Sequence, residues 1–190
     1  MGVSNQCKKV RVTIAIQEAQ WVLRAQCDDR EALELLLRSV QGPLHRYARS
    51  LVGPSAADDV LQDVLITICR KLRWLNKPEL FRPWAYRIAS RAAFRYLKKR
   101  RRWPEQLPDD FVLEEIPAPD ARPPAELLQH LLDTDVISSA SRAVLALHFQ
   151  EELSLQEVAA ILEIPLGTVK SRLAYGLTTL RKQLGRTRSL

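Results

Sequence analysis

The side chains best suited to chemistry lie on a predicted helix-turn-helix near the end of the chain. Residues 153–184 hold two apolar series at helical spacing, separated by Pro165 and Gly167. Pro165 cannot continue the first helix and Gly167 relaxes the backbone beyond it, as expected for two helices joined by a short turn. Ser154, with Glu157 three residues later, predicts a capping box where the first helix begins.

The second helix of this pair carries a polar face without a carboxylate. If Val169 and Leu173 point inward, four side chains share the outward face and a lysine flanks it. These are Thr168, Ser171, Arg172 and Tyr175, with Lys170 beside them. Arg can donate to guanine edges in a major groove, and Ser or Thr can contact bases or phosphates. The face predicts DNA binding; the alternative is a small helical hairpin with a solvated polar side.

A second candidate surface follows a predicted helix over residues 80–102. One stripe at helical spacing contains Trp84, Arg87, Arg91, Arg95, Lys98 and Arg102. Cations neutralise phosphates and aromatic rings stack on unpaired bases, so the stripe predicts a surface for single-stranded DNA or a duplex backbone. The five consecutive cations at 98–102 make a merely solvated face the weaker alternative. For Trp84 alone, a role in the core is an equally good interpretation.

An acidic face occurs on the predicted helix over residues 56–75. Asp59, Gln62 and Asp63 fall at i, i+3 and i+4. Acids in the first turn complement a helix dipole, which accounts for Asp59 better than for Asp63. The other interpretation is a docking face for a basic protein partner.

Charge and proline content divide the chain of 190 residues into parts. Residues 1–102 hold 21 Lys and Arg against 9 Asp and Glu, residues 103–124 hold 1 against 6, and residues 125–190 hold 7 of each. Six of the eleven prolines lie in 103–124, which predicts an extended acidic linker. Two interpretations of its acidity are open. It either keeps the linker soluble or lets the linker bind along a cationic channel in a partner, as nucleic acid would. We predict a partly disordered lead-in over residues 1–17 and helical domains over 18–102 and 125–190.

The fold class predicted for both domains is all-α, because Gly is scarce and Ala, Leu, Arg and Glu dominate. In the first domain the predicted helices cover residues 16–28, 30–40, 44–51, 56–75 and 80–102, with Gly42 and Pro43 as a break. In the second, two helices within residues 125–149 pack on the helix-turn-helix and complete a four-helix domain.

Several classes of protein are disfavoured by what the chain contains. Its thiols and imidazoles are Cys7, Cys27, Cys69, His45, His130 and His148. They include no CxxC and no ligand-spaced set, so we expect no metal, no cofactor and reduced thiols in the cytoplasm. No apolar run reaches the length of a membrane span and no signal peptide opens the chain. No carboxylate or His cluster supports an enzyme such as a nuclease.

Three stretches together resemble the extracytoplasmic-function group of bacterial RNA polymerase sigma factors, in the sigma-70 superfamily. The family's acidic polymerase-docking helix resembles DDVLQDVLITICRKL at 58–72, and its promoter-melting helix resembles LFRPWAYRIASRAAFRYLKKRRR at 80–102. Its helix-turn-helix resembles LSLQEVAAILEIPLGTVKSRL at 153–173. The resemblance covers about residues 21–184, in the family's order and with a linker in the expected place.

The resemblance implies partners for each surface. Asp59, Gln62 and Asp63 would dock on the clamp helices of the polymerase's largest subunit. Residues 76–80 would capture a base flipped from the −10 element. The residues implied for the opened −10 strand are Asn76, Lys77, Trp84, Arg87 and Arg91, and the stripe extends this surface to Arg95 and Lys98.

The resemblance also implies that the helix-turn-helix enters the major groove at the −35 element. The residues that would enter it are Thr168, Lys170, Ser171 and Arg172, with Tyr175 on the same face. The linker would thread the RNA path of the polymerase, and an anti-sigma protein would sequester the factor. A DNA-binding regulator that never joins polymerase is the alternative.

Four positions depart from the family's usual residues. The capture loop has Pro78 where a Gly is usual, Arg91 replaces an Asn, and Arg95 replaces an acid. Arg91 and Arg95 make the strand-binding face more cationic. Glu163 replaces the Gly of the helix-turn-helix turn, which costs little unless the position needs a positive φ.

Overall fold

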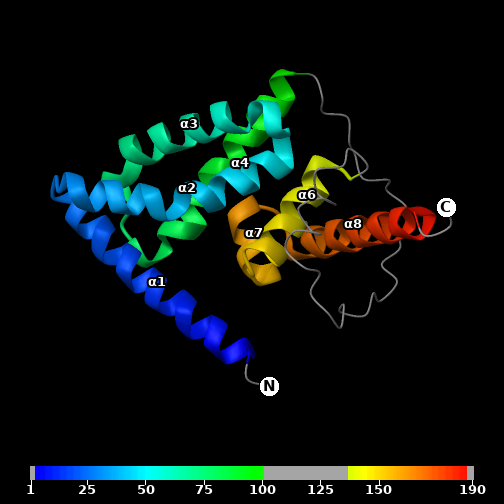
Figure 1. Cartoon of the computed structure of the whole chain (residues 1–190), viewed down its shortest axis with the longest axis horizontal. Helices are drawn as coiled ribbons and strands as arrows, with labels where there is room; N and C mark the ends of the chain where they lie inside the picture. Colours follow the sequence, from blue (N-terminus) through cyan, green and yellow to red (C-terminus); the bar gives the residue numbers. More distant parts are fainter. Residues whose placement is uncertain (1–2, 101–136, 188–190) are drawn as a thin grey trace.

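The protein is described by a computed structural model over residues 3–100 and 137–187, with side chains over 12–100 and 137–182 (Figure 1). Within these ranges every regular element is a helix, which confirms the all-α fold class. The first part contains α1 (Val3–Gln26), α2 (Arg30–Val52), α3 (Pro54–Lys71), η1 (Leu72–Trp74), η2 (Pro78–Leu80) and α4 (Phe81–Lys99). The second part contains α6 (Ser139–Leu145), η3 (Ala146–Gln150), α7 (Leu155–Leu162) and α8 (Leu166–Thr187). The predicted linker over 103–124 lies outside the described residues.

The first part is a bundle in which α2 and α4 lie at the centre. Helix α2 packs against α1, α3 and α4, and α3 packs against α4. The largest side chains at the centre are almost fully buried: Leu36, Leu44, Tyr47, Ile68 and Phe81. Each lies on the apolar stripe of its helix, so burial of these stripes positions the polar faces outward.

Helix α1 begins much earlier than the sequence predicted. It starts at Val3, so it covers most of the lead-in over residues 1–17 that was expected to be partly disordered. Its anchor is Glu18, which is 1% exposed and accepts hydrogen bonds from Arg82 and Ser39. Half-buried Ile14 and Ala15, a turn before it, line a cleft beside the start of α4. These contacts hold the helix against the bundle.

The break predicted at Gly42 and Pro43 is wrong, because α2 runs through both residues. A proline inside a helix removes one backbone hydrogen bond and crowds the preceding turn. Here Val40 and Leu44 flank the proline and are 2% and 1% exposed. Packing on both sides therefore holds the helix together across Pro43.

The long helix predicted over 56–75 ends at Lys71 and tightens into η1. The side-chain amide of Gln26 donates to the carbonyls of Leu72 at 2.9 Å and Leu75 at 3.0 Å. The Leu72 carbonyl also accepts from the Leu75 N–H at 3.0 Å, so these bonds together stabilise the turn that follows α3. Helix α4 ends at Lys99, one turn inside the predicted boundary.

The helix-turn-helix forms as predicted, and it begins with the predicted capping box. The Glu157 backbone N–H donates to Ser154 Oγ at 3.2 Å, and the Ser154 N–H donates to the Glu157 carboxylate at 2.7 Å. The turn contains Glu163 in the left-handed region, at φ 57° and ψ 43°. The position therefore does need a positive φ, and a non-glycine residue there costs about 1–2 kcal/mol of backbone energy.

The two parts of the chain pack against each other. Helix α2 contacts α6 and η3, and α4 contacts α7. Their buried apolar residues form one connected cluster that includes Val40 and Phe81 of the first part and Leu147 and Val158 of the second. This contact was not predicted from the sequence. In Figure 1, α6 and α7 lie between the first bundle and α8.

Candidate nucleic-acid interface

The second helix of the helix-turn-helix, α8, presents the predicted polar face. Val169 is fully buried beneath it and Leu173 packs against the core, as predicted. Lys170 is exposed, whereas Thr168, Ser171, Arg172 and Tyr175 are half-buried. The Ser171 hydroxyl donates to the Gly167 carbonyl at 3.0 Å, so its oxygen remains available as an acceptor.

Arg172 differs from an ordinary surface arginine. Its Nε is buried without a hydrogen-bond partner, and burial lowers the pKa of the guanidinium. The group still carries its charge, since an arginine does not deprotonate in a protein. An arginine on this partly exposed face can bind an acceptor such as a base edge or a phosphate through its terminal nitrogens.

The cationic stripe on α4 is arranged as predicted over its described length. Arg91, Arg95 and Lys98 are exposed, while Arg87 is half-buried. Trp84 is half-buried, with its ring 6.1 Å from that of Phe81. Trp84 therefore packs at the edge of the core and stays partly exposed, and its role in binding an unpaired base stays a prediction. Arg102 lies outside the described residues.

The loop before α4 contains an exposed aromatic residue that was not predicted as a site residue from the sequence. Asn76 and Lys77 are exposed between η1 and η2, as a capture loop requires. Beside them the Trp74 side chain is 60% exposed, and the Arg73 guanidinium lies 4.2 Å from its ring centroid. A large exposed aromatic next to cations offers a stacking surface for an unpaired base. Trp74 lies two residues after Leu72, the last residue of the apolar stripe, and this position could have predicted its exposure.

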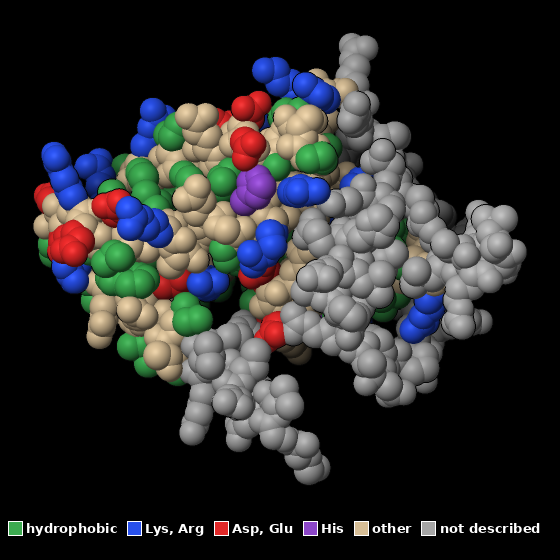
Figure 2. Space-filling view, in the orientation of Figure 1, with side chains coloured by type: hydrophobic (Ala, Val, Ile, Leu, Met, Phe, Trp, Pro, Cys, Tyr) green, Lys and Arg blue, Asp and Glu red, His purple; other side chains and the backbone are tan. Residues whose placement is uncertain are grey.

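The acidic face lies on the outer side of α3, opposite its buried stripe. Asp59, Gln62 and Asp63 are all exposed, and acidic side chains gather over this helix in Figure 2. Ile66 continues the same face one turn further on and is 42% exposed. An exposed isoleucine beside acids gives the face an apolar centre, which protein interfaces commonly have. Ile66 was not predicted from the sequence, although its i+3 spacing from Asp63 places it on the same face.

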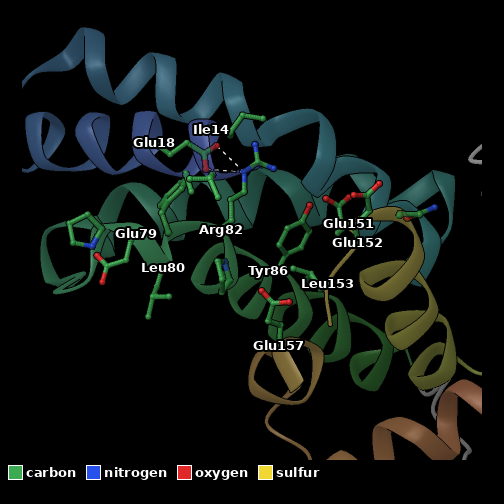
Figure 3. A pocket seen from close by; sticks show the side chains of 16 residues that line it. Ile14, Glu18, Glu79, Leu80, Arg82, Tyr86, Glu151, Glu152, Leu153 and Glu157 are labelled. Carbon is green, nitrogen blue, oxygen red and sulfur yellow. Dashed lines mark hydrogen bonds and ion pairs between the residues drawn. The ribbon is translucent and has the colours of Figure 1, made fainter. Parts of the chain in front are cut away.

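A cleft of about 580 Å³ separates α1 and the start of α4 from the segment before α7 (Figure 3). Apolar side chains of Ile14, Leu80 and Leu153 line it, together with several glutamates. Glu18 is held by Arg82, whose Nε lies 3.0 and 2.8 Å from the two carboxylate oxygens. The acidic lining makes the cleft a poor site for nucleic acid, so the DNA-binding candidates remain the faces of α4 and α8.

Two further properties limit the chemistry of the described residues. Among them, no group of three or more His, Cys, Asp and Glu side chains comes together to hold a metal ion. No described helix has both the length and the apolar character needed to cross a membrane.

Comparison with known proteins identifies the two parts. Residues 36–102 match the family described as Sigma-70 region 2, and residues 135–182 match Sigma-70, region 4. The chain belongs to the sigma-70 family, in its extracytoplasmic-function group. The α4 stripe and the α3 face lie within region 2, and the helix-turn-helix lies within region 4.

Relatives of this sigma-70 family member match over most of their length. The RNA polymerase sigma-H factor of Pseudomonas aeruginosa is 28% identical over 181 residues, which cover 88% of this chain and 94% of that protein. The ECF RNA polymerase sigma-E factor of Escherichia coli K12 is 29% identical over 164 residues, 80% of this chain and 86% of that protein.

Solved structures share the fold. The structure of CnrH in complex with the cytosolic domain of CnrY superposes with a TM-score of 0.66 at 21% identity, covering 90% of this chain and 98% of that chain. The Bartonella quintana sigma factor RpoE, in complex with the anti-sigma factor NepR, gives a TM-score of 0.61 at 22% identity, covering 80% and 96%.

Proposed function

We propose that the protein docks on core RNA polymerase, recognises the −35 and −10 promoter elements and helps to open promoter DNA. The observation that carries this proposal is the exposed α3 face of Asp59, Gln62, Asp63 and Ile66. It lies in a region that is otherwise strongly basic, so it serves a protein partner rather than DNA. A stand-alone DNA-binding regulator has no need of such a face.

The α4 stripe and the loop before it hold the opened −10 strand. Exposed Arg91, Arg95 and Lys98 bind its phosphates, with Arg87 at the head of the row. Asn76 and Lys77 border the pocket for a flipped base. Trp74 and the open side of Trp84 offer stacking surfaces, worth about 1–3 kcal/mol per base.

The α8 face binds duplex DNA at the −35 element. Arg172 donates to a base edge, and Thr168 and Ser171 contact bases or phosphates. Exposed Lys170 contacts the backbone and Tyr175 borders the face. Direct readout requires an intact duplex, whereas the α4 stripe requires bases outside the stack, so the two faces bind different parts of one promoter.

Binding energy, not covalent chemistry, drives the opening step in this proposal. Unpairing costs a few kcal/mol per base, and contacts on α4 offset that cost. The protein is not an enzyme, needs no cofactor, and acts in the cytoplasm, where the polymerase supplies the chemistry. Because two structural neighbours were solved as complexes with CnrY and NepR, an anti-sigma protein is the proposed negative regulator.

The test uses gel filtration with core polymerase, followed by run-off transcription on mapped promoters. The variant carries Asp59→Lys with Asp63→Lys, and we expect it to lose polymerase binding while it keeps DNA binding. The matched control is Asp58→Lys, because Asp58 is 89% exposed but pairs with His45 at 3.1 Å. A wild-type protein that forms no stable complex with core polymerase would contradict the proposal and favour the stand-alone regulator.

A further inference from the structure

The head of the α4 stripe is occupied by the turn of the helix-turn-helix. One Nη2 of Arg91 donates to both carboxylate oxygens of Glu163, at 2.8 and 2.7 Å. Arg87 Nη2 donates to the Ala160 carbonyl at 2.9 Å, and its Nη1 lies 3.6 Å from the same carboxylate. Two cations proposed to hold the opened strand thus contact the other DNA-binding domain.

Glu163 makes this contact from a backbone conformation that favours glycine. Its φ of 57° places it in the left-handed region at the end of α7. A glutamate stands there at a cost in backbone energy, and its side chain is turned toward the first part of the chain. Its described partners are the two arginines of α4, and both are more than 70 residues away in the chain.

We propose that Glu163 latches the free protein in a closed, DNA-inactive form by occupying Arg87 and Arg91. A carboxylate offers arginine the same bidentate, charge-assisted hydrogen bonds as a phosphate, so it competes directly with the DNA strand for these donors. The inference rests on the proposed function, since it names how that same strand-binding surface is regulated.

The rest of the structure is consistent with a form that opens after docking. The α3 face of Asp59, Gln62, Asp63 and Ile66 is exposed while the latch is closed, so polymerase can bind first. Separation of α4 from α7 frees the head of the stripe for the melted strand.

The test compares four full-length proteins: wild type, Glu163→Gln, Glu163→Gly and the control Glu34→Gln. Glu34 is the control because it accepts from Arg38 at 2.6 Å within α2, in a somewhat more exposed ion pair that does not cross domains. Fluorescence anisotropy measures binding to a short single-stranded DNA of mixed sequence. Energy transfer between dyes on α3 and α8 measures domain separation, through introduced cysteines in a chain with its three native cysteines replaced.

We expect Glu163→Gln and Glu163→Gly to bind the DNA about two- to five-fold more tightly than wild type, the size that a partly exposed ion pair supports. Energy transfer falls in both. Glu34→Gln changes neither quantity by as much. Equal gains in DNA affinity for Glu163→Gln and Glu34→Gln would overturn the latch, because net charge alone would then explain them. Unchanged energy transfer in Glu163→Gln would overturn it as well.

A swapped pair distinguishes a direct contact from a general loosening of the turn. Arg91→Glu combined with Glu163→Arg should recover part of the energy transfer that either single change loses. Recovery is incomplete because the new arginine also faces Arg87, whose Nη1 lies 3.6 Å from the Glu163 carboxylate. A double variant with no more energy transfer than the two single variants counts against the latch. Failure of the proposed function looks different: Glu163→Gln then separates the domains as expected, but the wild-type protein supports no transcription with core polymerase.

Discussion

The hydroxyl of Tyr47 lies 2.7 Å from Ser90 Oγ, and this pair joins α2 to α4 in the middle of the first bundle. Tyr47 is fully buried and Ser90 is 3% exposed. Ser90 Oγ also donates to the Tyr86 carbonyl at 2.8 Å. Because a serine hydroxyl has one proton, Tyr47 is the donor in the pair. Burial raises the pKa of Tyr47, so this donor keeps its proton throughout the physiological range.

Because Tyr47 donates and Ser90 accepts, we expect substitutions of the two residues to lower the free energy of unfolding by different amounts. We expect Ser90→Ala to lower the free energy of unfolding by about 1–3 kcal/mol, since it leaves the buried Tyr47 hydroxyl without a partner. Tyr47→Phe should cost less, about 0.5–1.5 kcal/mol, because Ser90 keeps its bond to Tyr86. Urea denaturation of both variants and of the double variant measures the difference. A larger cost for Tyr47→Phe than for Ser90→Ala would contradict the assigned direction.

Glu18 is expected to hold α1 against the bundle. Its buried carboxylate accepts from Arg82 Nε at 3.0 and 2.8 Å and from Ser39 Oγ at 2.8 Å. Glu18→Ala should lower the free energy of unfolding by about 2–4 kcal/mol, because it leaves Arg82 uncompensated at a site only 30% exposed. Hydrogen exchange should show faster exchange in α1 than in α3. Glu34→Ala is the control and should leave α1 protected, because Glu34 is exposed and pairs with Arg38 within α2.

Ile66 is expected to contribute to polymerase binding without contributing to the fold. Its side chain is 42% exposed on the α3 face, so Ile66→Ser should change the free energy of unfolding by less than about 0.5 kcal/mol. Loss of an apolar group at the centre of an interface should weaken binding to core polymerase by about ten-fold or more. Competition with a labelled wild-type protein measures this. Ile68→Ser is the contrasting variant, because Ile68 is fully buried and its loss should unfold α3. Unchanged affinity in Ile66→Ser would remove Ile66 from the docking face.

The sequence predicted those features that depend on neighbours in the chain. The capping box of Ser154 and Glu157, the turn at Pro165 and the stripe on α4 all follow from local spacing, and the structure contains them. The predicted site residues with described side chains all reach the surface fully or in part. Their contacts with polymerase and DNA stay predictions.

Features that depend on distant residues could not be predicted in the same way. The helix through Pro43 is sustained by burial of Val40 and Leu44 against other helices. At the end of α3, Gln26, 46 residues away, donates to the Leu72 carbonyl, and no pattern near Leu72 indicates that partner. The pairing of Arg91 with Glu163 depends on the contact between two domains, and no local pattern contains that information.

Acidic pH should weaken the contact between the two domains. The hydrogen bond from Arg91, followed by the charges of Arg91 and Arg87, lowers the pKa of Glu163 below its ordinary value of 4.5. A carboxyl with a lower pKa in the closed form stabilises that form above its ordinary pKa. This contribution is lost as the pH falls through the lowered value. Energy transfer between the domains should therefore decrease as the pH falls below about 4.5.

The control for this prediction is Glu163→Gln, which should lose that component of the pH dependence. Glu151 also crosses the interface, with its carboxylate 3.9 Å from Arg46 Nη2. Glu163→Gln retains Glu151, so a pH dependence that comes from Glu151 should persist in that variant. The same pH dependence in wild type and in Glu163→Gln would show that another group is responsible.

Gly176 is expected to be required for the close approach of α8 and α6. A Cβ at this position would lie 2.7 Å from Leu145 Cδ1 and 3.5 Å from the Ser141 Cβ, and Leu145 is fully buried. In an open helical position, Gly→Ala stabilises by about 0.5–1 kcal/mol. Here the clash should outweigh that gain, and Gly176→Ala should destabilise the protein by about 1–3 kcal/mol.

Gly167 supplies the matched control for Gly176, because it begins the same helix and no atom lies within 4 Å of its added Cβ. Gly167→Ala should be neutral or stabilising. Gly42 is less suitable, since a Cβ before Pro43 would crowd the proline ring. Thermal unfolding of the two alanine variants should thus shift the midpoint downward for Gly176→Ala only. If Gly176→Ala unfolds at a higher temperature than wild type, Leu145 has room to move, and the tight α6–α8 contact does not depend on the glycine.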